Sequence, residues 1–135
     1  MANLHAAIRG ILTADADVVA LVDDRIRPGE LDPTDTLPAC LVLIQEDAAQ
    51  DDLLGSGGWG QAVVRVECLD TDQPRAEQLA AAVREALDDY RGTVAGVTIT
   101  PATYTGMERE TEPATDDGEA AWHIVAPGFS VWYHS

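Results

Sequence analysis

A strand followed at once by a helix, over residues 62–90, constrains the fold more than any other part of the sequence. Residues 63–69 are apolar and β-branched with charged residues interleaved, a pattern typical of a strand with one face more deeply buried. Asp72 and Pro74 fit the start of a helix, and Gly92 fits a left-handed cap at its end. The apolar side chains of the helix recur at spacings of three and four, at Ala76, Leu79, Ala80, Val83, Ala86, Leu87 and Tyr90. We therefore expect one packed face and one solvated face.

Two short helices are predicted ahead of this unit. Asn3 is a suitable cap for the first, whose apolar stripe covers residues 4–12. Asp15 is a suitable cap for a second, shorter helix that ends before Asp23. Residues 25–27 are expected to form a short extended piece.

Three further strands are predicted, at residues 37–45, 94–107 and 122–133. Pro101 is expected to interrupt the second of them, and Pro127 with Gly128 to disturb the third locally. The order of elements predicts one α+β domain over residues 1–135. Its sheet is expected to have roughly four antiparallel or mixed strands, with helices packed on one face.

Two connections are long enough to attract attention. Residues 46–60 are acidic and then glycine-rich, and we expect a loop that exposes Leu53, Leu54 and Trp59. Either these side chains contact a partner, or Trp59 packs over the edge of the sheet. The glycines precede a strand and not a helix, so they do not predict a phosphate cradle. Residues 108–119 are charged and are expected to form a mobile connection at a hairpin tip.

The sequence holds no arrangement with a catalytic or metal-binding signature. His5, His123 and His134 are widely separated, and no HExxH, CxxC or GxxxxGK[ST] motif occurs. Close aspartates such as Asp15 and Asp17 are expected by composition in so acidic a chain, so they do not indicate a Mg²⁺ or Ca²⁺ site. We expect no catalytic, cofactor-binding or metal site and no enzymatic activity.

Cys40 and Cys68 both lie in apolar, strand-like runs. This placement favours their interpretation as small buried hydrophobic residues. Antiparallel pairing of the two strands would bring them close together, and the sequence leaves open whether they are bonded.

The chain is strongly acidic. Its 135 residues include 24 Asp and Glu against 8 Arg and no lysine, which gives a formal net charge of −16. Such a surface repels nucleic acids and anionic membranes, so binding through a basic patch is excluded. Neither a leader-like start nor an apolar run of membrane length is found, and we expect a soluble, unsecreted protein. Two origins of the acidity stay open: a salt-rich cytoplasm, where charge repulsion is screened within about 3 Å at molar salt, and a GC-rich genome that spends few codons on lysine.

Several sequence phrases occur in an order that resembles a known family. They are Ile8, Leu12, Asp15, Leu21-Val22, Arg25-Ile26 and Pro28; Leu37-Pro38-Ala39; Arg65-Val66-Glu67; Ala76, Leu79-Ala80, Val83 and Leu87; and Gly128-Phe129-Ser130-Val131-Trp132-Tyr133. Over nearly the whole chain they resemble the tail completion, or tail terminator, family of long-tailed double-stranded DNA viruses. The chain departs from that family in its acidity and in Gly128, where a polar residue often stands.

The resemblance implies a structural protein of the virion, assembled in the host cytoplasm. It implies a ring, usually a homohexamer, that closes the head-proximal end of the tail tube, stops its polymerisation and joins the tail to the neck of the head. The implied partners are further copies of the chain, the tail tube protein and a neck or head-completion protein, while DNA passes through the lumen without specific binding. As contacts with neighbours or tube we expect Leu53, Leu54, Trp59, Arg109 and Glu110.

Two other interpretations stay open. The chain could be another neck or tail component of the same virus, or an acidic binding module of a halophilic microbe. A binding module is expected to be monomeric or dimeric with one concave pocket, whereas a terminator is expected to have a flat ring interface.

Overall fold

The computed structural model describes residues 3–52, 55–114, 118 and 120–134. Its elements are α1 (Leu4–Thr13), α2 (Ala16–Val22), β1 (Ile26–Pro28), β2 (Ala39–Asp52), β3 (Gly55–Asp70), α3 (Gln73–Leu87), β4 (Gly92–Val94), β5 (Val97–Glu112) and β6 (Trp122–His134). The strands form one sheet in the order β1-β2-β3-β6-β5-β4, in which β1 is parallel to β2 and the other pairs are antiparallel. The predicted α+β class is confirmed.

The sheet has six strands where about four were predicted. The two additional strands, β1 and β4, are each three residues long and lie at the two edges. Strands this short contain too few residues for an alternating pattern to stand out in the sequence. Ala95 and Gly96 both have positive φ, of 51° and 77°, and form the tight turn that folds β4 back onto β5.

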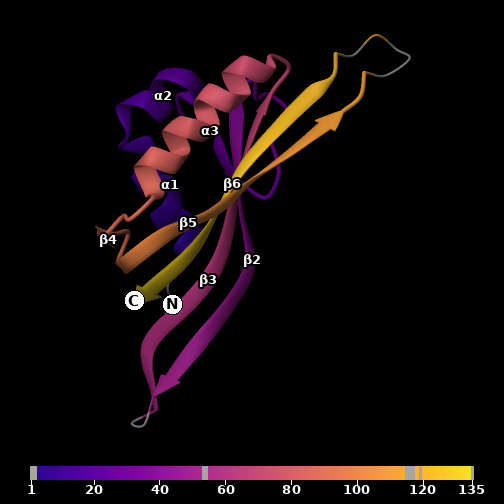
Figure 1. Ribbon diagram of the computed structural model, residues 1–135. Coiled ribbons are helices and arrows are strands. Elements are labelled where there is room, and N and C mark those ends of the chain that lie inside the picture. The colour runs from indigo at the N-terminus through magenta and orange to yellow at the C-terminus, as the bar shows by residue number, and fades with distance from the viewer. Residues whose placement is uncertain (1–2, 53–54, 115–117, 119, 135) are drawn as a thin grey trace.

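The three helices lie on one face of a strongly twisted sheet (Figure 1). From the part that the helices cover, the β2–β3 hairpin extends in one direction and the β5–β6 hairpin in the other. The opposite face of the sheet carries no helix among the described residues. This layering leaves the helix-free face available for contacts outside the chain where its side chains are exposed, whereas Leu69, Ile124 and Ala126, which point to the same face, are buried.

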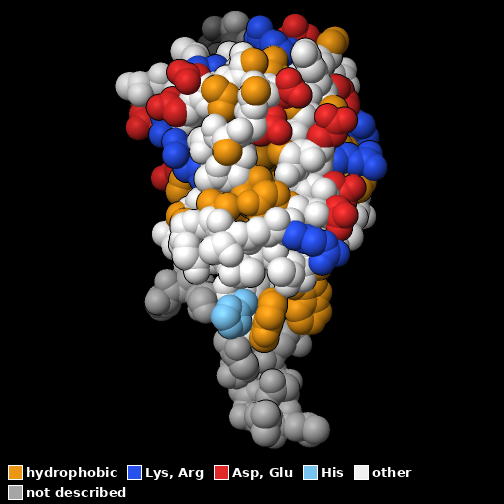
Figure 2. All heavy atoms as spheres, turned by 90° about the vertical axis from the view of Figure 1, so that its left-hand side faces the viewer, with side chains coloured by type: hydrophobic (Ala, Val, Ile, Leu, Met, Phe, Trp, Pro, Cys, Tyr) orange, Lys and Arg blue, Asp and Glu red, His pale blue; other side chains and the backbone are white. Residues whose placement is uncertain are grey.

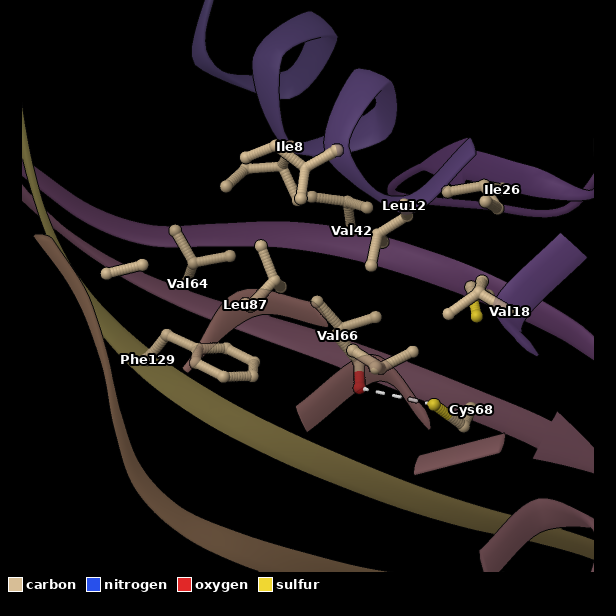
Figure 3. Packing of buried hydrophobic residues seen from close by; sticks show 14 of the residues in the cluster. Ile8, Leu12, Val18, Ile26, Val42, Val64, Val66, Cys68, Leu87 and Phe129 are labelled. Carbon is tan, nitrogen blue, oxygen red and sulfur yellow. Dashed lines mark hydrogen bonds between the residues drawn. The ribbon is translucent and has the colours of Figure 1, made fainter. Parts of the chain in front are cut away.

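The core lies between the helices and the sheet. Figure 3 shows Ile8 and Leu12 of α1 directed toward Val42 and Val64, the side chains of two neighbouring strands. The predicted packing face of α3 is confirmed, since its buried residues are Ala76, Leu79, Ala80, Val83 and Leu87. Burying each of the larger apolar side chains contributes roughly 1.5–3 kcal/mol before entropy is counted.

The predicted helix starts are largely confirmed. The side chain of Asn3 accepts a hydrogen bond from the amide of Ala6, and Asp15 accepts from the amides at the start of α2. Asp72 is the cap of α3, although its side chain makes no capping hydrogen bond. The prediction that Gly92 caps α3 is wrong, because the chain turns earlier through Asp89, at φ 60°, and Gly92 begins β4.

The prediction of a loop over residues 46–60 is wrong. Apart from 53–54, which lie outside the described residues, this segment forms the outer parts of β2 and β3. Ladder hydrogen bonds are made by the backbone, so a hairpin that starts in the core can continue through a polar, glycine-rich sequence. Where the β2–β3 hairpin begins to extend beyond the core, Tyr133 of β6 lies against Gly60 of β3 and donates a hydrogen bond to Asp47 of β2.

Three predictions concern β5 and β6. The register between the two strands shifts once around Pro101, between Ile99 and Ala102, as the proline predicted. The disturbance expected near Gly128 occurs in the same pairing, where the register shifts between Tyr104 and Gly106, opposite Phe129 and Gly128; the extra residue lies on β5, and β6 pairs with β3 in one constant register. Residues 108–112, expected in a mobile connection, belong to β5 because they pair with β6.

Cys40 and Cys68 are direct partners across the β2–β3 ladder, and both are fully buried free thiols. Burial raises the pKa of the Cys68 thiol well above its ordinary value. Their interpretation as buried apolar residues is therefore confirmed.

Candidate assembly surface

The exposed large hydrophobic side chains lie on the face of the sheet that the helices leave uncovered. Among the described residues they are Trp59, Val63 and Trp132, exposed by 39%, 37% and 36%. Trp59 and Val63 are four residues apart on β3, so they point to the same face of the sheet. Trp132 of β6 pairs with Gln61, which lies midway between them, and therefore points to that face too. Exposed apolar groups gathered on one face are typical of a surface that contacts another molecule.

Local contacts fix this apolar end of the face. The rings of Trp59 and His134 are 5.0 Å apart between centroids, and the amide of Gln61 donates to the hydroxyl of Ser130 at 3.1 Å. Both contacts join β3 to β6. Figure 2 shows a histidine with hydrophobic side chains next to it, above the grey atoms at the bottom of the view. The ring of Trp59 is packed against β6 within the single chain.

The described residues among the five predicted contacts, Trp59, Arg109 and Glu110, do not form one cluster. The other two, Leu53 and Leu54, lie outside the described residues. Trp59 is exposed as predicted, but it belongs to a strand and not to a loop. Arg109 and Glu110 are neighbours on β5, so their side chains point to opposite faces of the sheet.

Arg109 is directed toward the helices. Its guanidinium donates two hydrogen bonds to Glu77 of α3, at 2.6 and 3.0 Å. The hydrogen bond lowers the pKa of the Glu77 carboxyl and raises the pKa of Arg109. Arg109 therefore ties the β5–β6 hairpin to α3, while 55% of its side chain stays exposed.

Glu110 belongs to a charged cluster on the uncovered face. Arg65 lies at its centre and forms ion pairs with Glu67 at 2.9 Å, Glu108 at 2.5 Å and Glu110 at 3.0 Å. Burial alone would lower the pKa of Arg65, but the hydrogen bond to Glu110 and the nearby carboxylates raise it. Three glutamates around one arginine leave this end of the face negative.

Only Glu110 of this cluster was predicted from the sequence. The available signal was the alternation of Arg65 with Glu67, and of Glu108 with Glu110, since residues two apart on a strand share a face. Interpreting residues 108–119 as a mobile connection concealed the second pair. That the two pairs meet follows only from the strand order, which places β6 between β3 and β5.

A hollow of about 230 Å³ separates the apolar end of the face from the negative cluster. Val63, Arg65 and Glu108 are among the residues that line it. Gly106 and Gly128, which are partners across the β5–β6 ladder, also line it. Without side chains at these two positions the surface is open enough to receive a small apolar group.

Other kinds of site receive no support from the described ranges. Across 3–52, 55–114, 118 and 120–134, no group of three His, Cys, Asp or Glu residues is arranged to hold a metal ion. In the same part of the chain, no helix has the length and apolar character needed to cross a membrane.

Comparison with known proteins identifies the family. The sequence model of the family described as "Tail completion protein gp17" matches residues 6–134. The chain therefore belongs to the tail completion protein gp17 family, as the sequence phrases predicted, and is a tail-associated structural protein. No curated protein sequence matches at a significant level.

Solved structures agree with this fold. A chain from "Virion of native gene transfer agent (GTA) particle" has a TM-score of 0.66 at 19% identity, over 98% of this chain and 95% of that one. A second solved chain has a TM-score of 0.52 at 16% identity, over 92% of each. At these identities the likeness concerns the fold.

Proposed function

We propose that the protein is a non-enzymatic ring protein of a viral tail. In this proposal a homohexamer closes the head-proximal end of the tail tube, ends tube polymerisation and joins the tail to the neck of the head. Family membership over residues 6–134 is the observation that carries it. The tail tube protein and a neck or head-completion protein are the proposed partners, and assembly takes place in the host cytoplasm.

The uncovered face of the sheet supports the proposal. A closed ring needs one patch of a subunit to meet a different patch of its neighbour. Trp59 and Trp132 offer one such patch, because they are exposed and already ordered by contacts between β3 and β6. A net charge of −16 in every subunit also favours a lumen that does not retain DNA as it passes.

The same charge opposes assembly at low salt. Subunits that each carry −16 repel one another, and this repulsion is screened within a few ångströms at molar salt. Size-exclusion chromatography with light scattering, followed by negative-stain microscopy, should therefore be carried out in about 2 M KCl and in dilute buffer. The expected result is a hollow, closed ring at high salt, with about the six copies that the family resemblance implies.

The tryptophans supply a matched set of variants. Trp59→Ser and Trp132→Ser should each prevent ring formation, whereas Trp122→Ser, at the start of β6 in the other hairpin, should leave it intact. Thermal melting of each variant checks that it is folded. A wild-type protein that is monomeric in both salts and also fails to bind isolated tail tubes would contradict the proposal. Such a result would favour another tail role or a separate binding module.

A further inference from the structure

The hollow and the charged cluster together make a surface with two properties. Its floor lacks side chains at Gly106 and Gly128, and Val63 forms an apolar wall. Its rim carries Glu108 and Glu110, whose side chains are 69% and 54% exposed. An occupant of this surface can therefore seat a small apolar group against Val63 in the hollow, and it needs positive charge for the rim.

The rim carboxylates keep capacity for an outside cation. Arg65 is only 12% exposed, so it holds the glutamates from beneath and does not reach into solvent. One arginine faces three carboxylates, Glu67, Glu108 and Glu110, and each carboxylate can accept more hydrogen bonds than it receives here. The rim therefore attracts a cation more strongly than an isolated surface glutamate does.

A second copy of the chain is poorly suited to supply that cation. The sequence has no lysine, and a second copy brings the same net charge of −16. Each of its eight arginines already contacts its own chain: Arg27, Arg65, Arg75, Arg91 and Arg109 pair with carboxylates, Arg9 and Arg25 donate to carbonyls, and Arg84 lies over the Tyr104 ring. Charge complementarity therefore favours a different protein.

The spacing of the rim indicates the form of the occupant. Glu108 and Glu110 are alternate residues of β5, so their side chains leave the same face about 7 Å apart. Alternate side chains of an extended segment have the same spacing, since an extended chain rises about 3.3 Å per residue. Two cations at alternate positions of such a segment can each meet one glutamate.

We propose that this surface binds an extended, lysine- or arginine-rich segment of a different protein, with one apolar side chain seated in the hollow between Val63 and Gly128. Its cations pair with Glu108 and Glu110. The proposal rests on the proposed function only in that a tail tube or neck protein would supply the segment. The apolar end around Trp59 and Trp132 remains for contacts between copies.

Synthetic peptides test this proposal on the full chain without any other tail component. The first, the lysine–valine peptide, has the sequence Val-Ser-Lys-Ser-Lys, so its valine and both lysines point to the same side of an extended chain. The second, the lysine–serine peptide, has serine in place of that valine and the same charge. Binding is measured by isothermal titration calorimetry at low salt. We expect the lysine–valine peptide to bind about tenfold or more tightly than the lysine–serine peptide, because only valine fills the hollow.

Three protein variants complete the test. Glu108→Gln with Glu110→Gln should weaken the lysine–valine peptide about tenfold or more, since two charge-assisted hydrogen bonds are lost. Gly128→Ala should weaken it too, because an added Cβ would lie 3.2 Å from Oγ1 of Thr105 and narrow the hollow. The matched control, Asp17→Asn with Glu85→Gln, removes two exposed carboxylates from the helices and should change binding less than about twofold.

Two outcomes would overturn the proposal. Equal losses of peptide affinity in the rim variant, Glu108→Gln with Glu110→Gln, and in the control variant would mean that the peptide responds only to the net charge of the protein. Loss of self-association at high salt in the rim variant, with peptide binding unchanged, would assign the surface to a contact between copies. Ring formation by the wild type is measured separately, so failure of this proposal is distinguishable from failure of the proposed function.

Discussion

Gly10 offers a sharp test of how far tertiary packing overrides local propensity. It lies inside α1, where replacing glycine by alanine ordinarily stabilises a helix by about 1 kcal/mol. In the folded protein a Cβ at this position would lie 2.6 Å from Cγ1 of Val94 in β4. Carbon atoms in good contact are about 3.5–4.0 Å apart, so α1 and β4 must separate or Val94 must leave its rotamer.

The two effects have opposite signs. Overpacking of this kind costs about 1–3 kcal/mol, which exceeds the gain in helix propensity. We therefore expect Gly10→Ala to lower the free energy of unfolding by about 1 kcal/mol. With Val94→Ala present the clash disappears, and the same substitution should raise the free energy of unfolding by up to about 1 kcal/mol.

A double-mutant cycle measures both numbers. The wild type, the two single variants and the double variant are unfolded in urea at one fixed KCl concentration, and midpoints and slopes are compared. The expected coupling between the two sites is about 1–2 kcal/mol. If Gly10→Ala stabilises both backgrounds equally, the close approach of α1 to β4 is refuted.

Further predictions follow from charges and from pKa values. Arg75→Ala should lower the free energy of unfolding more than Asp70→Asn does, because it leaves the fully buried Asp70 carboxylate without its cation; equal losses in urea unfolding would contradict this. Burial alone would raise the pKa of Asp70, but the hydrogen bonds from Arg75 and from backbone amides lower it. The stability gained from that carboxylate is therefore complete above the pKa of about 4 that Asp70 has in the unfolded chain, and it is lost as the pH falls through the lower pKa of the folded protein. The difference in free energy of unfolding between the wild type and Asp70→Asn should therefore shrink in acid. Burial, with the hydrogen bond to Asp47, raises the pKa of Tyr133 to about 12. Since a tyrosine in the unfolded chain has a pKa near 10, the stability contributed by neutral Tyr133 is complete below about pH 10 and is lost as the pH rises through 12. In thermal melts Tyr133→Phe should therefore lose less stability than the wild type over this alkaline range. Finally, the net charge of −16 predicts a melting temperature that rises between dilute buffer and about 1 M KCl, and an unchanged midpoint would contradict a halophilic origin.

Elements with a strong local signal were predicted correctly. The apolar spacing from Ala76 to Leu87 identified α3 and its buried face, and Asn3 and Asp15 marked the starts of the first two helices. Each of these signals lies within one turn or a few turns of the chain. Residues 46–60 failed because acidic and glycine-rich sequence is typical of loops, whereas the strands there are held by pairing across the hairpin.

The candidate surface was predicted only in part. Trp59 and Glu110 were identified, and both lie on the uncovered face. Arg65, whose ion pairs span β3 and β5, was not identified as part of a surface, because two of its three carboxylate partners, Glu108 and Glu110, are 43 and 45 residues away in the chain. The ion pair of Arg109 with Glu77 of α3 was not predicted, because the two residues are 32 positions apart in the chain.

The sequence by itself determined the class of the fold, the main helices and the family, since these depend on periodicity, caps and the order of short phrases along the chain. It also determined the charge, and with it the exclusion of binding to nucleic acids through a basic patch. Only the tertiary structure decided which face of the sheet stays uncovered and which charges meet there. The physical reason is that strand order and register bring together residues far apart in sequence, and no local pattern encodes those pairings.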